Sequence, residues 1–276
     1  MKLFPGNHDI EGIHSRYSGA TSLNACYGAT NALINTLNWI SSPNWDGRYG
    51  IVVATDVAVY EEGPARPTGG CGAIAILISN KPKIALSPTR ASYIDDQYDF
   101  YKPIPSSEYP VVDGKSSMDL YINALRECFK LYKQKSGAKN PLDSTDFFCF
   151  HTPFYKMIQK AFDSLAKVEY PNISGQDSAN LFLQKVEPTL YVSKRIGNIY
   201  TGSLYACLIS LLYRTPDIKD KNIFLFSYGS GLCSTLLQGR VISNPISSSQ
   251  IADIDLMFNN RVQVPAEEYS RIMKYK

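Results

Sequence analysis

The sequence has 276 residues and a mass of 30.8 kDa, a size that suits one large domain or two fused halves. Hydrophobic residues make up 44% and charged residues 19%, which excludes a disordered chain. The net charge is only +3 with no stripe of Lys and Arg, and no apolar run approaches the ~20 residues of a membrane span, so neither nucleic acid nor a membrane is an expected partner.

The first predicted elements are one helix and three strands. Residues 25–39 form a largely apolar helical pattern and predict a buried helix. Two near-continuous apolar runs follow at 49–55 and 73–78, and each predicts a strand buried on both faces. Residues 83–86 are the expected hairpin partner of the second run.

The middle of the chain begins with an excursion at 95–113, which is rich in Tyr and Pro. Ordered excursions of this length are often functional. Apolar residues then recur at i, i+3, i+4 and i+7 over 117–133, a helix that Ser116 and Ser117 can cap. The polar segment 134–144 is an expected loop.

The remaining elements are two short buried strands and two helices. The strands are expected at 147–150 and 222–226. Pro153 suits the first position of a helix that reaches Leu165, and 199–213 is a second, buried helix. Residues 166–178 are polar and predict a loop. This mixture indicates an α/β fold with helices packed against a mostly buried sheet.

The cysteine and histidine content bears on the cellular compartment of the protein and on whether it binds a metal. Six widely spaced cysteines with no C-x-x-C pair are unlike a secreted disulfide scaffold. The first residues show neither a signal-peptide core nor an Arg-rich presequence, so the expected location is cytoplasmic. Three histidines without zinc spacing predict no metal.

Cys26 is the first candidate for chemistry, because it stands at the start of a predicted helix among small residues. The unpaired N–H groups of a helix N-terminus favour a thiolate, which is the nucleophilic form of cysteine. A buried structural cysteine is the alternative that this segment alone leaves open.

His151 and Asn198 are the next candidates. His151 follows a predicted strand, at the carboxyl end where α/β folds place their sites. Asn198 lies in a small-residue turn that opens a helix, and a glycine-rich turn follows the strand at 222–226. A structural histidine and an ordinary cap are the alternatives. Together, a Cys, a His and an Asn beside strand–helix junctions predict acyl-thioester chemistry.

Eight segments carry a specific resemblance over about residues 7–235. They are NACYG at 24–28, NWDGRY at 44–49, ARPTGG at 65–70, YDFYKP at 98–103, VDGK at 112–115, FHTP at 150–153, GN at 197–198 and FSYGSGL at 226–232. In this order they resemble eukaryotic hydroxymethylglutaryl-CoA synthases of the thiolase-like superfamily. The resemblance implies a layered α-β-α-β-α fold, with one half at 1–110 that carries Cys26 and a second half at 111–276 that carries His151 and Asn198.

The resemblance also implies a reaction. Acetyl-CoA would acetylate Cys26, and the deprotonated acetyl group would attack acetoacetyl-CoA to give HMG-CoA. His151 would polarise the acetoacetyl oxygens, and Asn198 would orient the acyl groups. The residues implied to line the acyl and pantetheine site are Tyr60, Thr68, Asp99, Ser117 and Ser230, and those implied to meet the CoA phosphates are Lys156 and Lys160, one turn apart on a helix.

The resemblance further implies a homodimer in the mevalonate pathway, with no cofactor beyond the CoA thioesters. Family members begin with a segment that carries a general-base glutamate and continue into another segment after position 276. Nothing before Asn24 resembles the first segment, so the expected fold is truncated at both ends and retains an unpaired sheet edge.

Two other functions remain open from the sequence. One is an inactive homologue that still binds CoA or a partner chain, because general-base catalysis contributes typically ~10²–10⁴-fold. The other is a different thiolase-like acyltransferase. Local departures from the family pattern, at Ala29, Pro64 and Thr152, are compatible with function.

Overall fold

A four-stranded sheet forms the centre of the computed structural model, which describes residues 19–274. Its strand order is β3-β8-β7-β6. β6 and β7 are parallel, and β8 is antiparallel to both of its neighbours. Side chains of β6 and β7 such as Phe148 and Phe224 are fully buried, so the core lies on both faces of this sheet. The strands are β3 (Ile84–Ile94), β6 (Phe147–Phe150), β7 (Asn222–Gly229) and β8 (Cys233–Val241).

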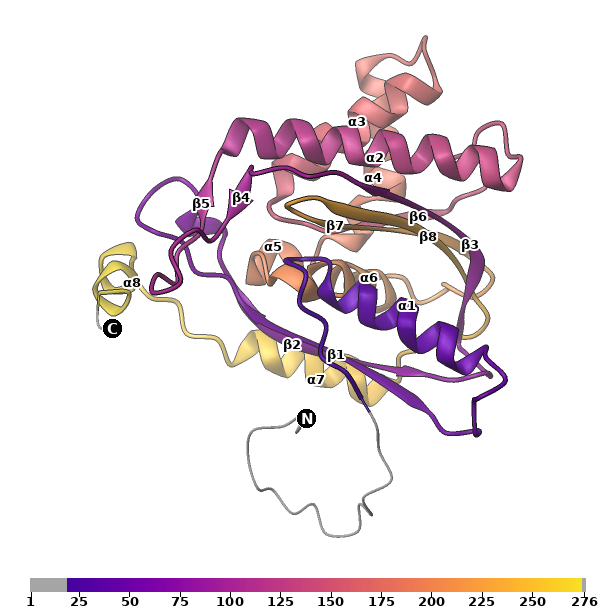
Figure 1. The fold of residues 1–276 in the computed structure, drawn as a ribbon, viewed down its shortest axis with the longest axis horizontal. Helices are drawn as coiled ribbons and strands as arrows, with labels where there is room; N and C mark the ends of the chain where they lie inside the picture. Colours follow the sequence, from indigo (N-terminus) through magenta and orange to yellow (C-terminus); the bar gives the residue numbers. More distant parts are fainter. Residues whose placement is uncertain (1–18, 275–276) are drawn as a thin grey trace.

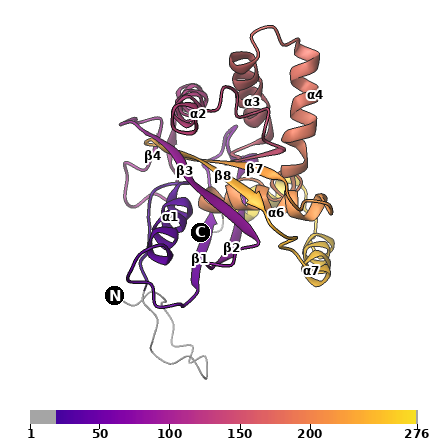
Figure 2. The same ribbon diagram turned by 90° about the vertical axis from the view of Figure 1, so that its right-hand side faces the viewer.

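Helices cover both faces of this sheet. A second, two-stranded sheet lies beyond the helices on one of these faces (Figures 1 and 2). One face carries α2 (Gly114–Ser136), α3 (Tyr155–Glu169) and α4 (Gly175–Lys185). The other carries α1 (Gly28–Ile40) and α6 (Ser203–Arg214), followed by β1 (Gly50–Val57) paired with β2 (Cys71–Ile78).

Shorter elements connect these layers. They are η1 (Arg66–Thr68), β4 (Phe100–Tyr101), β5 (Val111–Val112), η2 (Glu187–Thr189), α5 (Ser193–Ile196) and η3 (Tyr200–Gly202). Two further helices, α7 (Ser248–Asn259) and α8 (Ala266–Ile272), follow the central sheet.

The helix starts differ from the sequence prediction. Asp113, not Ser116 or Ser117, caps α2: its carboxylate accepts hydrogen bonds from the N–H groups of Lys115 and Ser116, and the serines already lie inside the helix. α3 begins at Tyr155, because the extended Phe154 is its N-cap. Pro153 therefore stands before the helix rather than at its first position.

The predictions for β1, β2 and residues 83–86 were wrong in two respects. One face of the β1–β2 pair is exposed, including Ile51, Val53 and Leu77, because no described element covers it. Apolar composition cannot show whether a second layer is present. The segment 83–86 is not the hairpin partner of β2, since it opens β3, which pairs with β8.

Two loop predictions also change. The segment 166–178 holds the end of α3 and the start of α4, where Ser174 caps the helix by accepting from the Asp177 N–H. The excursion at 95–113 is ordered and contains the small β4–β5 pair. Backbone bonds between Asp95 and Leu232 attach it to the turn between β7 and β8.

Candidate active site

The turn that holds Cys26 lies directly before α1. Ala25 adopts a positive φ of 39°, and the Tyr27 N–H donates to the Asn24 carbonyl at 2.8 Å. The Tyr27 N-cap position has no side-chain cap, but Thr201 accepts from the Ala29 N–H at 2.5 Å. These contacts place the Cys26 thiol at the helix N-terminus, as the sequence predicts.

The protonation state of Cys26 differs from the prediction. Burial, and then the negative charge of Asp56 on β1, raise the pKa of the Cys26 thiol above its ordinary value. The favourable charge of a helix N-terminus does not outweigh this desolvation. The thiol is therefore neutral in the free protein, and its proton must leave when it reacts.

The backbone of two elements holds His151 at the end of β6. Its N–H donates to the Phe226 carbonyl at 2.8 Å, and its carbonyl accepts from the Tyr121 hydroxyl at 2.6 Å. The side chain is 2% exposed, and Nδ1 has no hydrogen-bond partner. Burial lowers the pKa of His151 to about 3, so the imidazole is neutral.

Asn198 lies where two glycine-containing loops touch. Its N–H donates to the Thr68 carbonyl at 2.7 Å. A Cβ on Gly70 would lie 1.9 Å from the Ile196 carbonyl oxygen, and Gly197 has a φ of 75°. Only glycine permits this approach, so the two loops hold the buried amide in one place.

Tyr60 connects Asn198 to an aromatic wall. The Asn198 Nδ2 group donates to the Tyr60 hydroxyl at 3.1 Å. The rings of Tyr60, Phe100 and Tyr200 pack edge to face with centroids 6.0–6.3 Å apart. Thr68 ends η1 and donates its hydroxyl proton to the Ala65 carbonyl at 2.7 Å, which fixes the loop beside this wall.

Several buried polar side-chain atoms have no hydrogen-bond partner within residues 19–274. They include both carboxylate oxygens of Asp99, Nδ1 of His151, and the hydroxyls of Ser227 and Tyr228. A buried polar group without a partner costs about 1–3 kcal/mol, and unpaired groups in native proteins often mark a place for a ligand. The hydroxyls and the imidazole can donate to carbonyl oxygens of a substrate, whereas the Asp99 carboxylate can only accept.

Electrostatic effects indicate which of these side chains converge on Cys26. Burial raises the pKa values of Tyr60, Tyr200 and Tyr228, and the charge that Cys26 carries as a thiolate raises each further. The Asp99 charge raises the pKa of Tyr228 as well. The tyrosines are therefore neutral hydrogen-bond donors around one sulfur.

His151 joins this group through Tyr121. The Tyr121 hydroxyl binds the His151 carbonyl, and the Tyr121 ring lies 4.8 Å from the Tyr228 ring. The nucleophile turn and His151 are thus both attached to β7 or to the turn after it, and the Asn198 amide is linked to Tyr60, whose pKa the charge of a Cys26 thiolate would raise. A Cβ on Gly229 would lie 2.8 Å from the Tyr27 nitrogen, so the β7–β8 turn presses against the nucleophile turn.

The other predicted binding residues lie farther out. Ser230 is half-buried in the β7–β8 turn, and Ser117 is half-buried in the first turn of α2. Lys156 and Lys160 are exposed on α3, which begins four residues after His151. Their i, i+4 spacing places both ammonium groups on one helix face.

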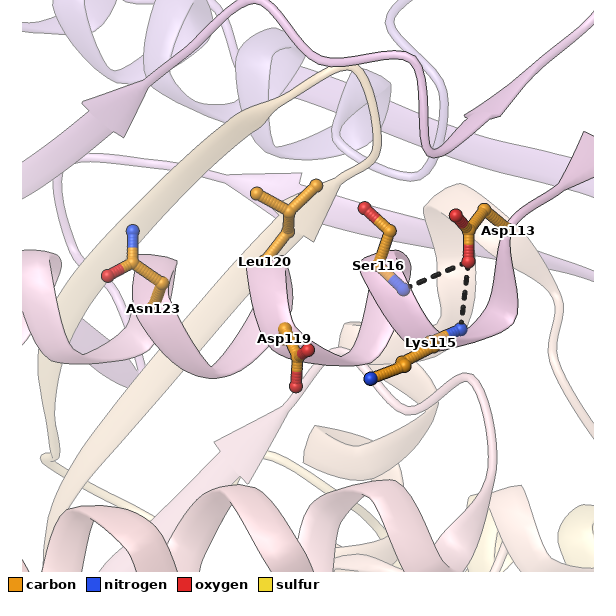
Figure 3. A pocket seen from close by; sticks show the side chains of 6 residues that line it. All are labelled: Asp113, Lys115, Ser116, Asp119, Leu120 and Asn123. Carbon is orange, nitrogen blue, oxygen red and sulfur yellow. Dashed lines mark hydrogen bonds between the residues drawn. The ribbon is translucent and has the colours of Figure 1, made fainter.

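A shallow hollow of about 460 Å³ lies at the start of α2 (Figure 3). Its lining residues are Asp113, Lys115, Ser116, Asp119, Leu120 and Asn123. The Asp113 carboxylate already binds the free N–H groups there. None of Cys26, His151 and Asn198 lines this hollow.

Residues 19–274 contain neither a cluster of metal-binding side chains nor a membrane-spanning helix. No group of three His, Cys, Asp or Glu side chains in this part of the chain could hold a metal ion. Within the same residues, no helix has the length and hydrophobicity that crossing a bilayer would require.

Sequence reasoning missed Asp56, Tyr200 and Tyr228 as members of the site. Asp56 had a signal, because it is a charged residue inside an apolar strand segment. Tyr200 and Tyr228 stand inside the segments around Asn198 and the glycine turn. Only the fold brings them close enough to Cys26 for a charge on the sulfur to affect their pKa values.

Comparisons with known proteins match the whole chain. The model of the hydroxymethylglutaryl-coenzyme A synthase N-terminal domain matches residues 1–101. The model of the C-terminal domain of the same enzyme matches residues 84–178 and 172–276. The two C-terminal matches overlap at residues 172–178, which span the end of the α3–α4 connection and the start of α4.

Two curated relatives are each 37% identical to the chain. Hydroxymethylglutaryl-CoA synthase B of Dictyostelium discoideum aligns with 99% of this chain and 68% of its own length. The mitochondrial hydroxymethylglutaryl-CoA synthase of Sus scrofa aligns with 100% and 63%. Both alignments run over 329 residues, so the relatives carry about fifty residues inside the matched region that this 276-residue chain lacks.

Solved structures show the same fold. MvaS in complex with 3-hydroxy-3-methylglutaryl coenzyme A superposes with a TM-score of 0.83 and 29% identity, over 92% of this chain and 66% of that one. An HMG-CoA synthase complexed with CoA gives 0.78 and 30%, over 92% and 64%. The chain thus has the thiolase-like fold, spans about two thirds of these proteins, and belongs to the hydroxymethylglutaryl-CoA synthase family.

Proposed function

We propose that the protein condenses acetyl-CoA with acetoacetyl-CoA through an acetyl-Cys26 intermediate and releases HMG-CoA. The observation that supports this proposal is a neutral thiol before α1, a buried neutral imidazole at the end of β6, and buried polar side chains that have no hydrogen-bond partner among the described residues. A neutral imidazole still has one N–H group that can donate to a substrate oxygen in a buried site.

The first step is acetyl transfer. The Cys26 sulfur attacks the thioester carbonyl, its proton is removed, and CoA leaves as the thiol. Tyr60, Tyr200 and Tyr228 are neutral donors near the sulfur, so each can stabilise oxygen charge as it develops.

The second step is carbon–carbon bond formation. A base removes a proton from the acetyl methyl group, and the resulting carbanion attacks the ketone of acetoacetyl-CoA. His151, neutral and with Nδ1 unpaired, would hydrogen-bond the acetoacetyl oxygens. Water then cleaves the thioester bond to Cys26 and frees HMG-CoA. The charge of the Asp56 carboxylate raises the pKa of the Cys26 thiol, so it opposes formation of the thiolate in the first step.

The proposal extends to the substrate path, the partner and the location, with the family membership as its support. Thr68, Asp99, Ser117 and Ser230 would line the path of the acyl and pantetheine groups, and Lys156 and Lys160 would bind the phosphates. The chain would need no cofactor beyond CoA thioesters. It would act as a cytoplasmic homodimer that supplies mevalonate synthesis, although its relatives include both a cytoplasmic protein of Gallus gallus and mitochondrial ones.

The test is to incubate the purified chain with acetyl-CoA and measure its mass, then to add acetoacetyl-CoA and assay HMG-CoA. We expect one acetyl group per chain, lost in Cys26→Ser and kept in Cys233→Ser, a matched half-buried cysteine.

HMG-CoA formation supports the proposal. Acetylation without condensation favours the inactive homologue that binds CoA. Transfer to other acceptors favours a different acyltransferase. No acetylation at Cys26 overturns the proposed mechanism.

A further inference from the structure

The side-chain amide of Asn198 has a defined polarity. Its Oδ1 atom accepts from the Tyr200 backbone N–H at 2.9 Å and from the Ser203 hydroxyl at 2.8 Å. A backbone N–H can only donate, so the group facing it must be the oxygen. A flipped amide would place two donors 2.9 Å apart. The Nδ2 group therefore faces the Tyr60 hydroxyl.

Ser203 is the second determinant of this polarity. It is the first residue of α6 and 1% exposed. Its oxygen accepts from the Ile199 N–H at 2.9 Å, which leaves its own proton for Asn198 Oδ1. The Tyr200 N–H thus fixes the Asn198 amide directly, and the Ile199 N–H fixes it indirectly by orienting the Ser203 hydroxyl.

The polarity has a consequence at Tyr60. Because Asn198 Nδ2 donates to the Tyr60 oxygen, the phenol acts as the acceptor in that bond and its proton points elsewhere. Burial raises the pKa of this phenol, so it stays protonated. The Tyr200 and Thr68 hydroxyls are further hydrogen-bond partners of Tyr60, so its O–H can face one of these or an oxygen bound near the sulfur.

We propose that Ser203 is a positioning residue: by orienting the Asn198 amide, it directs the Tyr60 hydroxyl proton toward the thioester oxygen of the acyl group. This role rests on the proposed acyl transfer at Cys26. Ser203 itself touches no reacting atom, so its loss changes the rate of the chemical step more than the binding of acetyl-CoA.

Ser210 provides a matched control on the same helix. It is fully buried, accepts from the Val192 N–H at 2.9 Å and donates to the Ala206 carbonyl at 2.8 Å. Ser203→Ala and Ser210→Ala each remove a hydroxyl and leave one backbone N–H without its partner. A purely structural role would give the two variants the same kinetic effect.

The test measures the rate and acetyl-CoA dependence of Cys26 acetylation in both variants, with thermal unfolding alongside. We expect similar losses of Tm in both. Ser203→Ala should acetylate about tenfold more slowly at saturation with KM within twofold of the parent, whereas Ser210→Ala keeps the parent rate. Equal rates in the two variants, or a change confined to KM, would overturn the proposal.

A second measurement does not require activity. In protein labelled with ¹⁵N-asparagine, the Asn198 side-chain signals, assigned by their loss in Asn198→Asp, should show cross-relaxation with the Tyr60 ring. Ser203→Ala should weaken or broaden these signals, and Ser210→Ala should not. If the parent chain fails to acetylate but this pattern holds, the proposed function fails while the amide orientation stands. Unchanged signals in Ser203→Ala refute the positioning role.

Discussion

At the scale of single residues, His151 is the buried group whose protonation state most affects stability. Its imidazole is 2% exposed, and burial lowers its pKa to about 3. In the unfolded chain a histidine titrates near pH 6.5. The unfolded state therefore binds the proton first as the pH falls. Stability from this group is complete above about pH 6.5 and decreases by about 1.4 kcal/mol per pH unit down to about pH 3.

This linkage predicts a different pH dependence for His151→Gln. Glutamine cannot titrate, so the loss of unfolding free energy between pH 7 and pH 5 should be smaller in the variant by about 2 kcal/mol. Urea denaturation of both proteins at the two pH values measures the difference. Identical losses in both proteins would show that the buried imidazole is not held neutral.

A second residue-scale prediction concerns the reactivity of Cys26. The Asp56 charge raises the pKa of the thiol in addition to burial, so Asp56→Asn should lower this pKa. The thiolate fraction at pH 8 rises, and alkylation of Cys26 by iodoacetamide should be several-fold faster, as followed by peptide mass spectrometry. Asp46→Asn, at an exposed carboxylate paired with Arg48, is the control and should leave the rate unchanged. A slower reaction in Asp56→Asn would contradict the electrostatic assignment.

At the scale of elements, the site depends on the contact between the loop after η1 and the loop after α5. A Cβ on Gly70 would meet the Ile196 carbonyl oxygen at 1.9 Å, whereas a Cβ on Gly114 has open space. Gly70→Ala should lower the unfolding free energy by about 2 kcal/mol or more and displace Asn198, because backbone atoms must move. Gly114→Ala at the start of α2 should be neutral or slightly stabilising. Denaturant midpoints compare the two, and an equal effect would mean that the loops can separate without cost.

The elements differ in how far the sequence predicts them. The helices around Tyr121, Met157 and Leu204 are found where their apolar periodicity places them, because the same face is buried. β8 was missed, since polar and small residues such as Ser234, Thr235 and Gly239 interrupt its apolar pattern. The hydroxyls of Ser234 and Thr235 form hydrogen bonds with partners distant in sequence, such as the 2.5 Å bond between the Tyr27 and Thr235 hydroxyls. Only tertiary contacts make those positions suitable for a buried strand.

The candidate site shows the same division. Motifs around Cys26, His151 and Asn198 were visible in the sequence, because each lies in one short segment. The protonation states were not predictable, since they depend on burial by segments far apart in the chain. The predicted thiolate at Cys26 became a neutral thiol for this reason.

At the scale of the whole molecule, the layers follow from the α/β pattern, but the environment of the β1–β2 pair does not. Its register places Ile51 opposite Leu77 and Val53 opposite Ala75 on one face. These four side chains are exposed and none is charged. An apolar strand surface of this kind favours association, because natural sheets usually place charges where they must stay in water.

The proposed homodimer can be tested on this face. Val53→Lys places a charge at its centre, and burying an unpaired ammonium group against a second copy is costly. Val53 is 53% exposed in the single chain, so the variant should unfold at the same denaturant concentration as the parent. Sedimentation velocity should then show a dimer for the parent and a monomer for Val53→Lys. Leu183→Lys, at an equally exposed leucine on α4, should remain a dimer. If Val53→Lys also remains a dimer, the two copies associate through another surface and this sheet face is not the interface.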